Sequence, residues 1–161
     1  MNKSIRIGGA SGFWGDSYRA TEQLLQDTTL DFIVYDYLAE ITMSIMARAR
    51  AKSPSAGYAT DFIDAVIKPY IKRISTHNTR LISNAGGVNP EKCAEVISEL
   101  VKDLQLNLNV SCITGDDLMS SAQEIKNMNC KEMFSDIKFP ELDKVASMNA
   151  YLGAFAISKA L

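Results

Sequence analysis

The stretch Arg80-Leu-Ile-Ser-Asn-Ala-Gly-Gly-Val-Asn-Pro-Glu-Lys-Cys-Ala-Glu-Val-Ile97 shows how this chain is built. Its short apolar run, Leu81–Ser83, predicts a strand, and Asn89-Pro90 then opens an amphipathic helix. Gly86-Gly87 lies in the loop between them. Glycines let a ligand approach the backbone, and the helix behind the loop directs free N–H groups and a partial positive charge at the same place. The stretch therefore predicts a strand–loop–helix unit whose loop suits an anion.

The same unit occurs three more times along the chain. The other predicted strands are Ile5–Gly8, Phe32–Tyr35 and Leu108–Ile113. Each is followed by residues at helical spacing, which are Ala20, Leu24 and Leu25 after the first, Leu38, Ile41, Ile45 and Ala49 after the second, and Leu118, Ala122 and Ile125 after the fourth. Strands that alternate with helices predict an α/β fold, an open and mainly parallel, Rossmann-like sheet with helices on both faces.

Two further helices complete the expected fold. The apolar residues from Phe62 to Ile74 predict one helix, which Pro69 should kink or divide because proline removes a backbone hydrogen bond. The last helix is expected from about Leu142 or Ser147 to Leu161. Because such an apolar helix normally returns into another strand, we expect residues 1–161 to form a single domain that resembles the N-terminal part of a longer fold.

Composition and charge exclude several classes of protein. The chain has 161 residues, of which 47% are hydrophobic and 22% charged, and no apolar run approaches the ~20 residues that a membrane span needs. The net charge of −2 and the scattered Lys and Arg residues argue against nucleic-acid binding. The start of the chain leaves no room for a secretory signal, so we expect a cytoplasmic protein.

The cysteines and the single histidine carry no recognisable catalytic or metal motif. Cys93, Cys112 and Cys130 are odd in number and far apart, which predicts reduced thiols. Any Ser-His or Cys-His pair would need His77. That residue precedes the third strand and is expected at the edge of the sheet opposite the carboxyl ends of the strands.

Polar and glycine residues gather at the predicted carboxyl ends of the strands. In open parallel sheets ligands bind in the crevice at this edge, so we expect the site there. The candidate residues for binding a substrate or anion are Gly9, Ser11, Gly12, Trp14, Asp16, Asn84, Gly86, Gly87, Asn89, Thr114 and Gly115.

Three acidic residues at the same edge are the candidate catalytic groups, Asp36, Glu40 and Asp116. Asp36 and Glu40 are four apart and would face the same side of a helix, where they could act as acid and base or hold a cation. Alternatively Asp36 caps the helix and Glu40 complements its dipole. If the three carboxylates converge, a cation, a shared proton or hydrogen bonds from Asn84 must relieve their repulsion. We assign no metal ligands, and the sequence identifies no cofactor.

A dinucleotide site is an alternative. Gly9, Gly12 and Gly15 follow the first strand at a spacing that is similar to the dinucleotide-binding fingerprint, and Asp36 ends the second strand, where an acid would bind ribose. This interpretation predicts an NAD(P)-dependent oxidoreductase. Asp16 argues against it, because its carboxylate would lie near the pyrophosphate.

Six blocks together resemble the N-terminal core of the acyclic terpene utilisation family. The blocks are Ile7-Gly-Gly-Ala-Ser-Gly-Phe-Trp-Gly-Asp-Ser17, Asp36-Tyr-Leu-Ala-Glu-Ile-Thr-Met-Ser44, Gly57-Tyr-Ala-Thr-Asp-Phe62, Ser83-Asn-Ala-Gly-Gly-Val-Asn-Pro90, Thr114-Gly-Asp-Asp-Leu118 and Asn149-Ala-Tyr-Leu-Gly-Ala154. The resemblance implies a bacterial protein of monoterpene catabolism, linked to the breakdown of branched isoprenoids such as citronellol and geraniol. It implies a pathway rather than a mechanism.

The sequence therefore supports two further hypotheses besides the oxidoreductase. The first is an enzyme, or part of one, that binds an anionic small molecule, acyl-CoA-linked or phosphorylated, at Gly86-Gly87 and the helix start at Asn89. The second is a non-catalytic subunit whose sheet edge joins a partner chain or a missing C-terminal portion. A homo-oligomer is compatible with both hypotheses.

Overall fold

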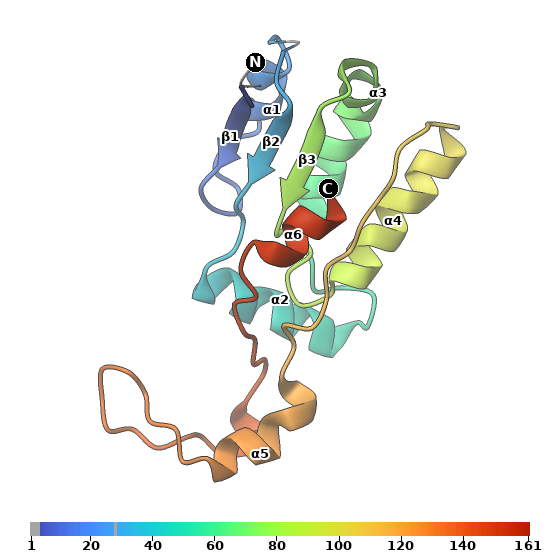
Figure 1. The fold of residues 1–161 in the computed structure, drawn as a ribbon. Coiled ribbons are helices and arrows are strands. Elements are labelled where there is room, and N and C mark those ends of the chain that lie inside the picture. Colours follow the sequence, from blue (N-terminus) through green and yellow to red (C-terminus); the bar gives the residue numbers. More distant parts are fainter. Residues whose placement is uncertain (1–3, 28) are drawn as a thin grey trace. The chain divides into compact units, whose positions relative to one another are not determined.

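The computed structural model describes residues 4–27 and 29–161 (Figure 1). The chain divides into two compact units, Met1–Cys112 and Ile113–Leu161, and each is described by itself. The first unit contains a three-stranded parallel sheet with the strand order β1-β2-β3. Its strands are β1 (Ile7–Ser11), β2 (Phe32–Tyr35) and β3 (Arg80–Ser83). The predicted α/β fold with an open parallel sheet is confirmed.

The first strand lies further along the chain than its sequence predicts. The expected range is Ile5–Gly8, but the ladder to β2 pairs Ile7 with Phe32 and continues to Ser11. Gly9, Ala10 and Ser11 therefore belong to the strand and not to the loop after it. Glycine has a low strand propensity, but the pairing with the apolar β2 overrides it.

One face of the sheet carries the core of the first unit. Ile33 and Tyr35 on β2 are 0% and 3% exposed. Helix α1 (Ala20–Leu24) packs on this face, where Thr21 Oγ1 and Tyr35 Oη are hydrogen-bonded at 3.0 Å. The Phe62 ring meets the Tyr35 ring edge-on, with 5.3 Å between centroids. The core is therefore built from the sheet and from helices that lie over Tyr35.

The helix between β2 and β3 is divided near Pro69, as predicted. Residues Phe62–Ile67 form a π-helix, η1, and Lys68–His77 form the α-helix α3. Pro69 has no N–H group to bond the carbonyl of the preceding turn, and the wider π-turn before it accommodates this loss. His77 lies in the last turn of α3, before β3.

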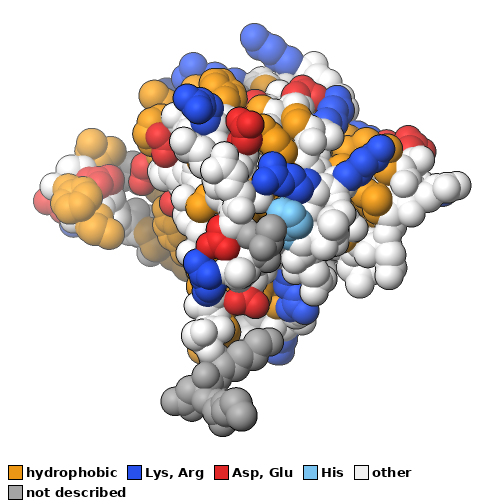
Figure 2. Space-filling view, turned by 90° about the horizontal axis from the view of Figure 1, so that it is seen from above, with side chains coloured by type: hydrophobic (Ala, Val, Ile, Leu, Met, Phe, Trp, Pro, Cys, Tyr) orange, Lys and Arg blue, Asp and Glu red, His pale blue; other side chains and the backbone are white. Residues whose placement is uncertain are grey.

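Figure 2 shows Lys, Arg, Asp and Glu side chains interspersed on the face seen from above, without a patch of one sign.

Helix α2 (Glu40–Lys52) lies below the carboxyl ends of the strands in Figure 1, and its apolar residues at helical spacing do not form its buried side. Ile41 and Ile45 are 70% and 49% exposed. The buried residues are Thr42, Met46 and Ala47. The Met46 side chain fills the space beside the glycines after β3, and this contact sets which side of α2 faces inward.

Helix α4 (Pro90–Asp103) forms as predicted and buries Cys93 and Val101. The predicted fourth strand, Leu108–Ile113, is wrong, because the structure assigns no strand to these residues. Leu106, Leu108 and Val110 do pack against the core, and the residues between them are exposed. The alternation of apolar and polar residues shows which side chains face inward, but it does not ensure that the backbone pairs with a neighbouring strand.

The second unit contains short elements only. These are η2 (Met119–Ser121), α5 (Ala122–Asn127), η3 (Leu142–Lys144) and α6 (Phe155–Ala160). The predicted helix from Leu142 or Ser147 to the end is therefore wrong in length. Gly153 has a φ angle of +71°, which interrupts a right-handed helix before α6 begins. Across the described residues, no helix combines the length and the hydrophobicity that crossing a bilayer requires.

Candidate functional site

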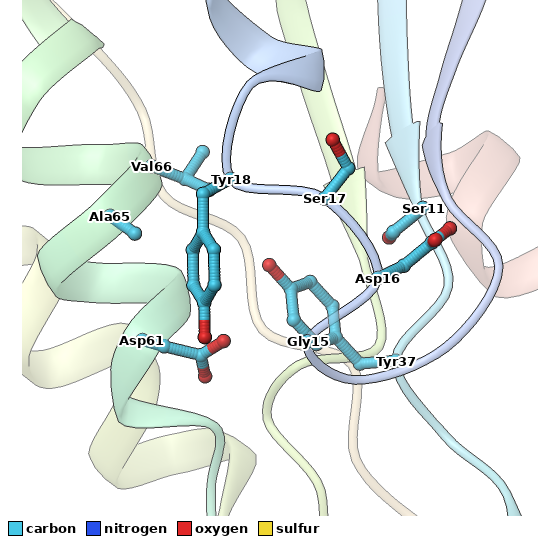
Figure 3. Close-up of a pocket in the computed structure, with 9 residues that line it drawn as sticks. All are labelled: Ser11, Gly15, Asp16, Ser17, Tyr18, Tyr37, Asp61, Ala65 and Val66. Atoms are coloured by element: carbon cyan, nitrogen blue, oxygen red, sulfur yellow. The ribbon is translucent and has the colours of Figure 1, made fainter.

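A small pocket lies at the carboxyl ends of β1 and β2, within the first unit (Figure 3). The loop after β1 forms one side and η1 forms the other. This is the edge of the sheet at which the sequence predicts the site. The lining residues are Ser11, Gly15, Asp16, Ser17, Tyr18, Tyr37, Asp61, Ala65 and Val66.

The β1 side of the pocket depends on an irregular strand end. The register with β2 shifts between Gly9 and Ser11, which leaves Ala10 as an extra residue. Such a bulge changes the direction of the side chain that follows it, and here that side chain is Ser11, which lines the pocket. The loop then turns through Gly15, whose φ angle of +85° favours glycine.

Asp16 closes this loop on itself. Its carboxylate oxygen accepts a hydrogen bond from the backbone N–H of Gly12 at 2.9 Å. The Gly12 amide is therefore already occupied by an anionic partner of the chain. Of the three glycines at fingerprint spacing, Gly9 lies in the ladder of β1 and the amide of Gly12 is already bound to Asp16.

Tyr37 forms the floor between the two sides. Its side chain is 6% exposed, and its ring packs edge-on against Phe62 with 5.8 Å between centroids. Burial raises the pKa of the Tyr37 phenol, and the nearby Asp61 carboxylate raises it further. The phenol is therefore protonated at neutral pH and can donate a hydrogen bond to a ligand oxygen.

Asp61 approaches the pocket from the start of η1. Its carboxylate accepts a short hydrogen bond from the indole N–H of Trp14, which ties the loop after β1 to η1. Figure 3 shows the Tyr18 hydroxyl pointing toward Asp61. With Asp16 and Asp61 both at its lining, the pocket carries carboxylate acceptors and hydroxyl donors together. That combination suits a neutral hydroxyl or carbonyl group better than an anion.

Asp36 and Asn84 join the ends of the strands beside the pocket. The Asn84 side-chain amide donates to Asp36 Oδ1 at 2.7 Å, and Asn84 Oδ1 accepts from the Tyr37 N–H at 2.7 Å. The Ser11 hydroxyl donates to the Asp36 carbonyl at 3.2 Å. The residue that precedes α2 as its N-cap is Ala39, so Asp36 is not the cap of that helix. Glu40 is the first residue of α2 and is exposed.

The Gly86-Gly87 turn is packed into the structure. A Cβ atom at Gly87 would lie 2.7 Å from the carbonyl oxygen of Gly57. The Val88 N–H bonds that same carbonyl at 2.9 Å, and the Asn89 N–H bonds the Gly86 carbonyl at 2.9 Å. An anion at this turn would have to displace these internal hydrogen bonds.

Asn89 holds the turn through its side chain. Its amide donates to the carbonyl of Pro54 at 2.9 Å and to that of Ala56 at 2.8 Å. The Asn89 side chain is therefore hydrogen-bonded to the loop before η1, and it makes no capping hydrogen bond to α4.

Thr114, Gly115 and Asp116 belong to the second unit. There the Asn149 side-chain amide donates to Asp116 Oδ2 at 2.9 Å, and an antiparallel bridge pairs Asp117 with Asn149. The convergence of Asp116 with Asp36 and Glu40 stays a prediction. Among the described residues, no three His, Cys, Asp or Glu side chains are grouped so that they could hold a metal ion.

Four polar residues of the pocket lining were missed as site residues, namely Ser17, Tyr18, Tyr37 and Asp61. Tyr37 follows Asp36 directly, at the end of a strand, so the rule that located Asp36 could also have found it. Asp61 lies in a helix far from any strand end in the sequence. The signal that could have found it is the block Gly57–Phe62, which contains it and is one of the six blocks of the family resemblance.

Comparison with known proteins adds one finding. A family model described as "Acyclic terpene utilisation family protein AtuA" matches residues 5–161. No curated protein and no solved structure matches the chain.

Proposed function

The chain belongs to the acyclic terpene utilisation family, and we therefore propose that it is an enzyme, or part of one, that binds an acyclic terpene derivative at the carboxyl ends of β1 and β2. The pocket beside Tyr37 receives the oxygen-bearing end of the substrate. We expect the protein to act in the bacterial cytoplasm, in monoterpene catabolism.

The observation that supports this proposal is that Tyr37 and Asp61 both line the pocket. The protonated phenol donates a hydrogen bond to the substrate oxygen, and a carboxylate accepts the proton of a substrate hydroxyl. Asp16 adds a second carboxylate at the lining. An anionic end group is disfavoured at this position, because it would meet both carboxylates at short range.

The candidate catalytic residues keep their roles in this proposal. Asp36 lies beside the pocket, where the Asn84 amide binds its carboxylate. It directly precedes Tyr37 in the chain. Glu40 follows at the start of α2. Asp116 lies in the second unit, and its catalytic role stays a prediction. An anionic part of the substrate, such as an acyl-CoA or phosphate group, remains an alternative ligand for the Gly86-Gly87 turn.

Fluorescence of Trp14 provides the test. It is the only tryptophan, and its indole binds a residue of the pocket. We expect geraniol to change the emission saturably, and Tyr37→Phe to weaken the binding about tenfold, which corresponds to the loss of one buried hydrogen bond. Tyr70→Phe is the matched control, since it removes a phenolic hydroxyl outside the lining.

Further ligands separate the alternatives. Inorganic phosphate and CoA probe the anion site, and NADH and NADPH probe the dinucleotide site. A response to phosphate or CoA that Tyr37→Phe leaves unchanged would favour the anion hypothesis. If geraniol gives no saturable change while a dinucleotide does, the proposed hydroxyl site is wrong and the oxidoreductase hypothesis replaces it.

A further inference from the structure

The carboxylate of Asp61 lies at the start of η1, but it does not cap that helix. An aspartate at the N-cap ordinarily accepts a hydrogen bond from the first amides of its own helix. Asp61 is the N-cap of η1 and makes no such bond. Its carboxylate accepts instead the indole N–H of Trp14, 47 residues earlier in the chain. The Asp61 side chain is therefore directed away from its helix and into the lining of the pocket.

The other carboxylate of the lining, that of Asp16, has different surroundings. Asp16 is exposed, and its Oδ2 accepts the N–H of Gly12 in its own loop. Asp61 is half-buried, and Trp14 binds its Oδ1. Among the described residues, no hydrogen bond reaches Asp61 Oδ2. The half-buried carboxylate binds a ligand hydroxyl more strongly than the exposed one, because less solvent screens the interaction.

The Tyr37 hydroxyl supplies a donor in the same space. Its residue is 6% exposed and lines the pocket, and within the described part of the chain the hydroxyl has no hydrogen-bond partner. Burial raises the pKa of this phenol and the Asp61 carboxylate raises it further, so the two groups lie within electrostatic reach of each other. The pocket therefore offers one unbonded donor and one unbonded acceptor to a ligand.

We propose that Asp61 accepts the hydrogen bond of the ligand hydroxyl and that Trp14 is the residue that positions Asp61. Trp14 packs against the core, and its indole N–H holds one carboxylate oxygen, which keeps the carboxylate ionised and leaves the other oxygen to the ligand. Trp14 thus acts through Asp61. This inference rests on the proposed function, because the hydroxyl is that of the proposed substrate.

The single tryptophan allows a test that needs no ligand. In a ¹⁵N-labelled chain the indole N–H of Trp14 gives one resonance, since the sequence contains no other tryptophan. We expect this resonance to shift as Asp61 is protonated at acid pH, and Asp61→Asn to remove the shift. Asp64→Asn is the matched control, because Asp64 lies on η1 but is exposed and paired with Lys68. A resonance that does not respond to pH would overturn the proposal.

Geraniol binding, measured by calorimetry because Trp14→Phe removes the fluorophore, tests the role of the pair in the pocket. We expect Trp14→Phe to weaken binding about tenfold at pH 7. The pH at which binding is half lost on acidification should rise by about one unit, since a carboxylate that loses a donor takes up a proton more readily. The other titratable residues of the lining, Asp16, Tyr18 and Tyr37, stay in place in this variant.

A double variant separates positioning from packing. In a chain that already carries Asp61→Ala, Trp14→Phe should cause no further loss of geraniol binding, because the carboxylate through which Trp14 acts is absent. An equal loss with and without Asp61 would show that Trp14 acts by packing alone and would overturn the proposal. If the original chain binds no geraniol while the indole resonance still titrates, the proposed function is wrong, whereas the pairing of Trp14 with an ionised Asp61 is supported.

Discussion

At the scale of single residues, the glycines of this chain serve its backbone more than a ligand. Gly87 has a φ angle of +54° and lies against Met46 and Gly57. If Gly87 served only an anion, a bulky residue there would remove ligand binding and leave the fold intact. The contacts indicate instead that the fold itself requires glycine at this position.

We predict that Gly87→Ala lowers the free energy of unfolding by about 2 kcal/mol or more, through overpacking and an unfavourable φ angle. The Met46 side chain can move, but the Gly57 carbonyl 2.7 Å from the new Cβ is backbone and cannot. Urea unfolding followed by Trp14 fluorescence measures the change. Gly9→Ala is the control, since no atom lies within 4 Å of its Cβ position. Equal stabilities of the two variants would contradict the prediction.

The hydrogen bonds of Asn84 lead to a second prediction. Asn84→Ala removes a partner from the Tyr37 N–H and from the Asp36 carboxylate, so the free energy of unfolding should fall by about 1–3 kcal/mol. Asp36→Asn keeps an acceptor for Asn84 and should change stability by less than about 1 kcal/mol while lowering ligand binding. Asp36 would lose its proposed role if its variant were unstable and still bound ligand normally.

Alkaline pH should destabilise the first unit. Burial raises the pKa of the Tyr35 phenol to about 12 and that of the Cys93 thiol to about 11. Both groups are protonated in the folded state at a pH where the unfolded chain has lost the proton. Their contribution is therefore complete below about pH 8 and is lost as the pH rises through 11 and 12.

We expect the free energy of unfolding to fall by about 2 kcal/mol between about pH 9 and pH 11, as urea titrations at each pH would show. Tyr35→Phe should flatten the upper part of this dependence. Tyr151→Phe should not, because Tyr151 is fully exposed. If the original chain and both variants lose stability equally as the pH rises, groups other than Tyr35 cause the pH dependence.

At the scale of elements, the π-helix η1 connects the core to the pocket. Its first residue, Phe62, packs on Tyr35 and Tyr37, and the preceding residue, Asp61, reaches the pocket and Trp14. π-Turns occur frequently at functional sites, where the extra residue redirects side chains. Here the widened turn before Pro69 places a core aromatic and a pocket carboxylate in succession.

We predict that Phe62→Ala lowers the free energy of unfolding by about 3–5 kcal/mol, since it empties the space between two buried tyrosine rings. Phe134→Ala is the comparison, and its effect should stay within about 0.5 kcal/mol, because that ring is 90% exposed. Thermal unfolding followed by circular dichroism measures both. Similar losses in the two variants would show that η1 is not anchored by Phe62.

At the scale of the whole molecule, the hydrophobic core belongs to the first unit. The cluster of buried residues runs from Ala10 to Val101, and the residues that pack against it end at Val110. The second unit exposes large apolar side chains, among them Phe134, Tyr151 and Phe155. Burial of apolar surface is the main stabilising contribution to folding, so the two units should differ in stability.

A chain truncated after Cys112 should therefore keep the cooperative urea transition that Trp14 reports, with a midpoint close to that of the full chain. A separate peptide of residues 113–161 should show little far-ultraviolet helical signal. Loss of the transition on truncation would mean that the second unit is required for the fold of the first.

The sequence by itself determined the strand–loop–helix order, β2, β3, the division of the helix at Pro69 and the edge of the sheet at which the pocket lies. These features follow from local patterns, because hydrophobic periodicity and proline act within a few residues. Only the tertiary structure decided which side of α2 is buried, that residues 108–113 do not pair as a strand, and that Asp61 joins Tyr37 in one pocket. Each of these depends on contacts between residues far apart in the chain, such as Met46 with Gly87 and Trp14 with Asp61. The spacing of residues along the sequence contains no information on such contacts.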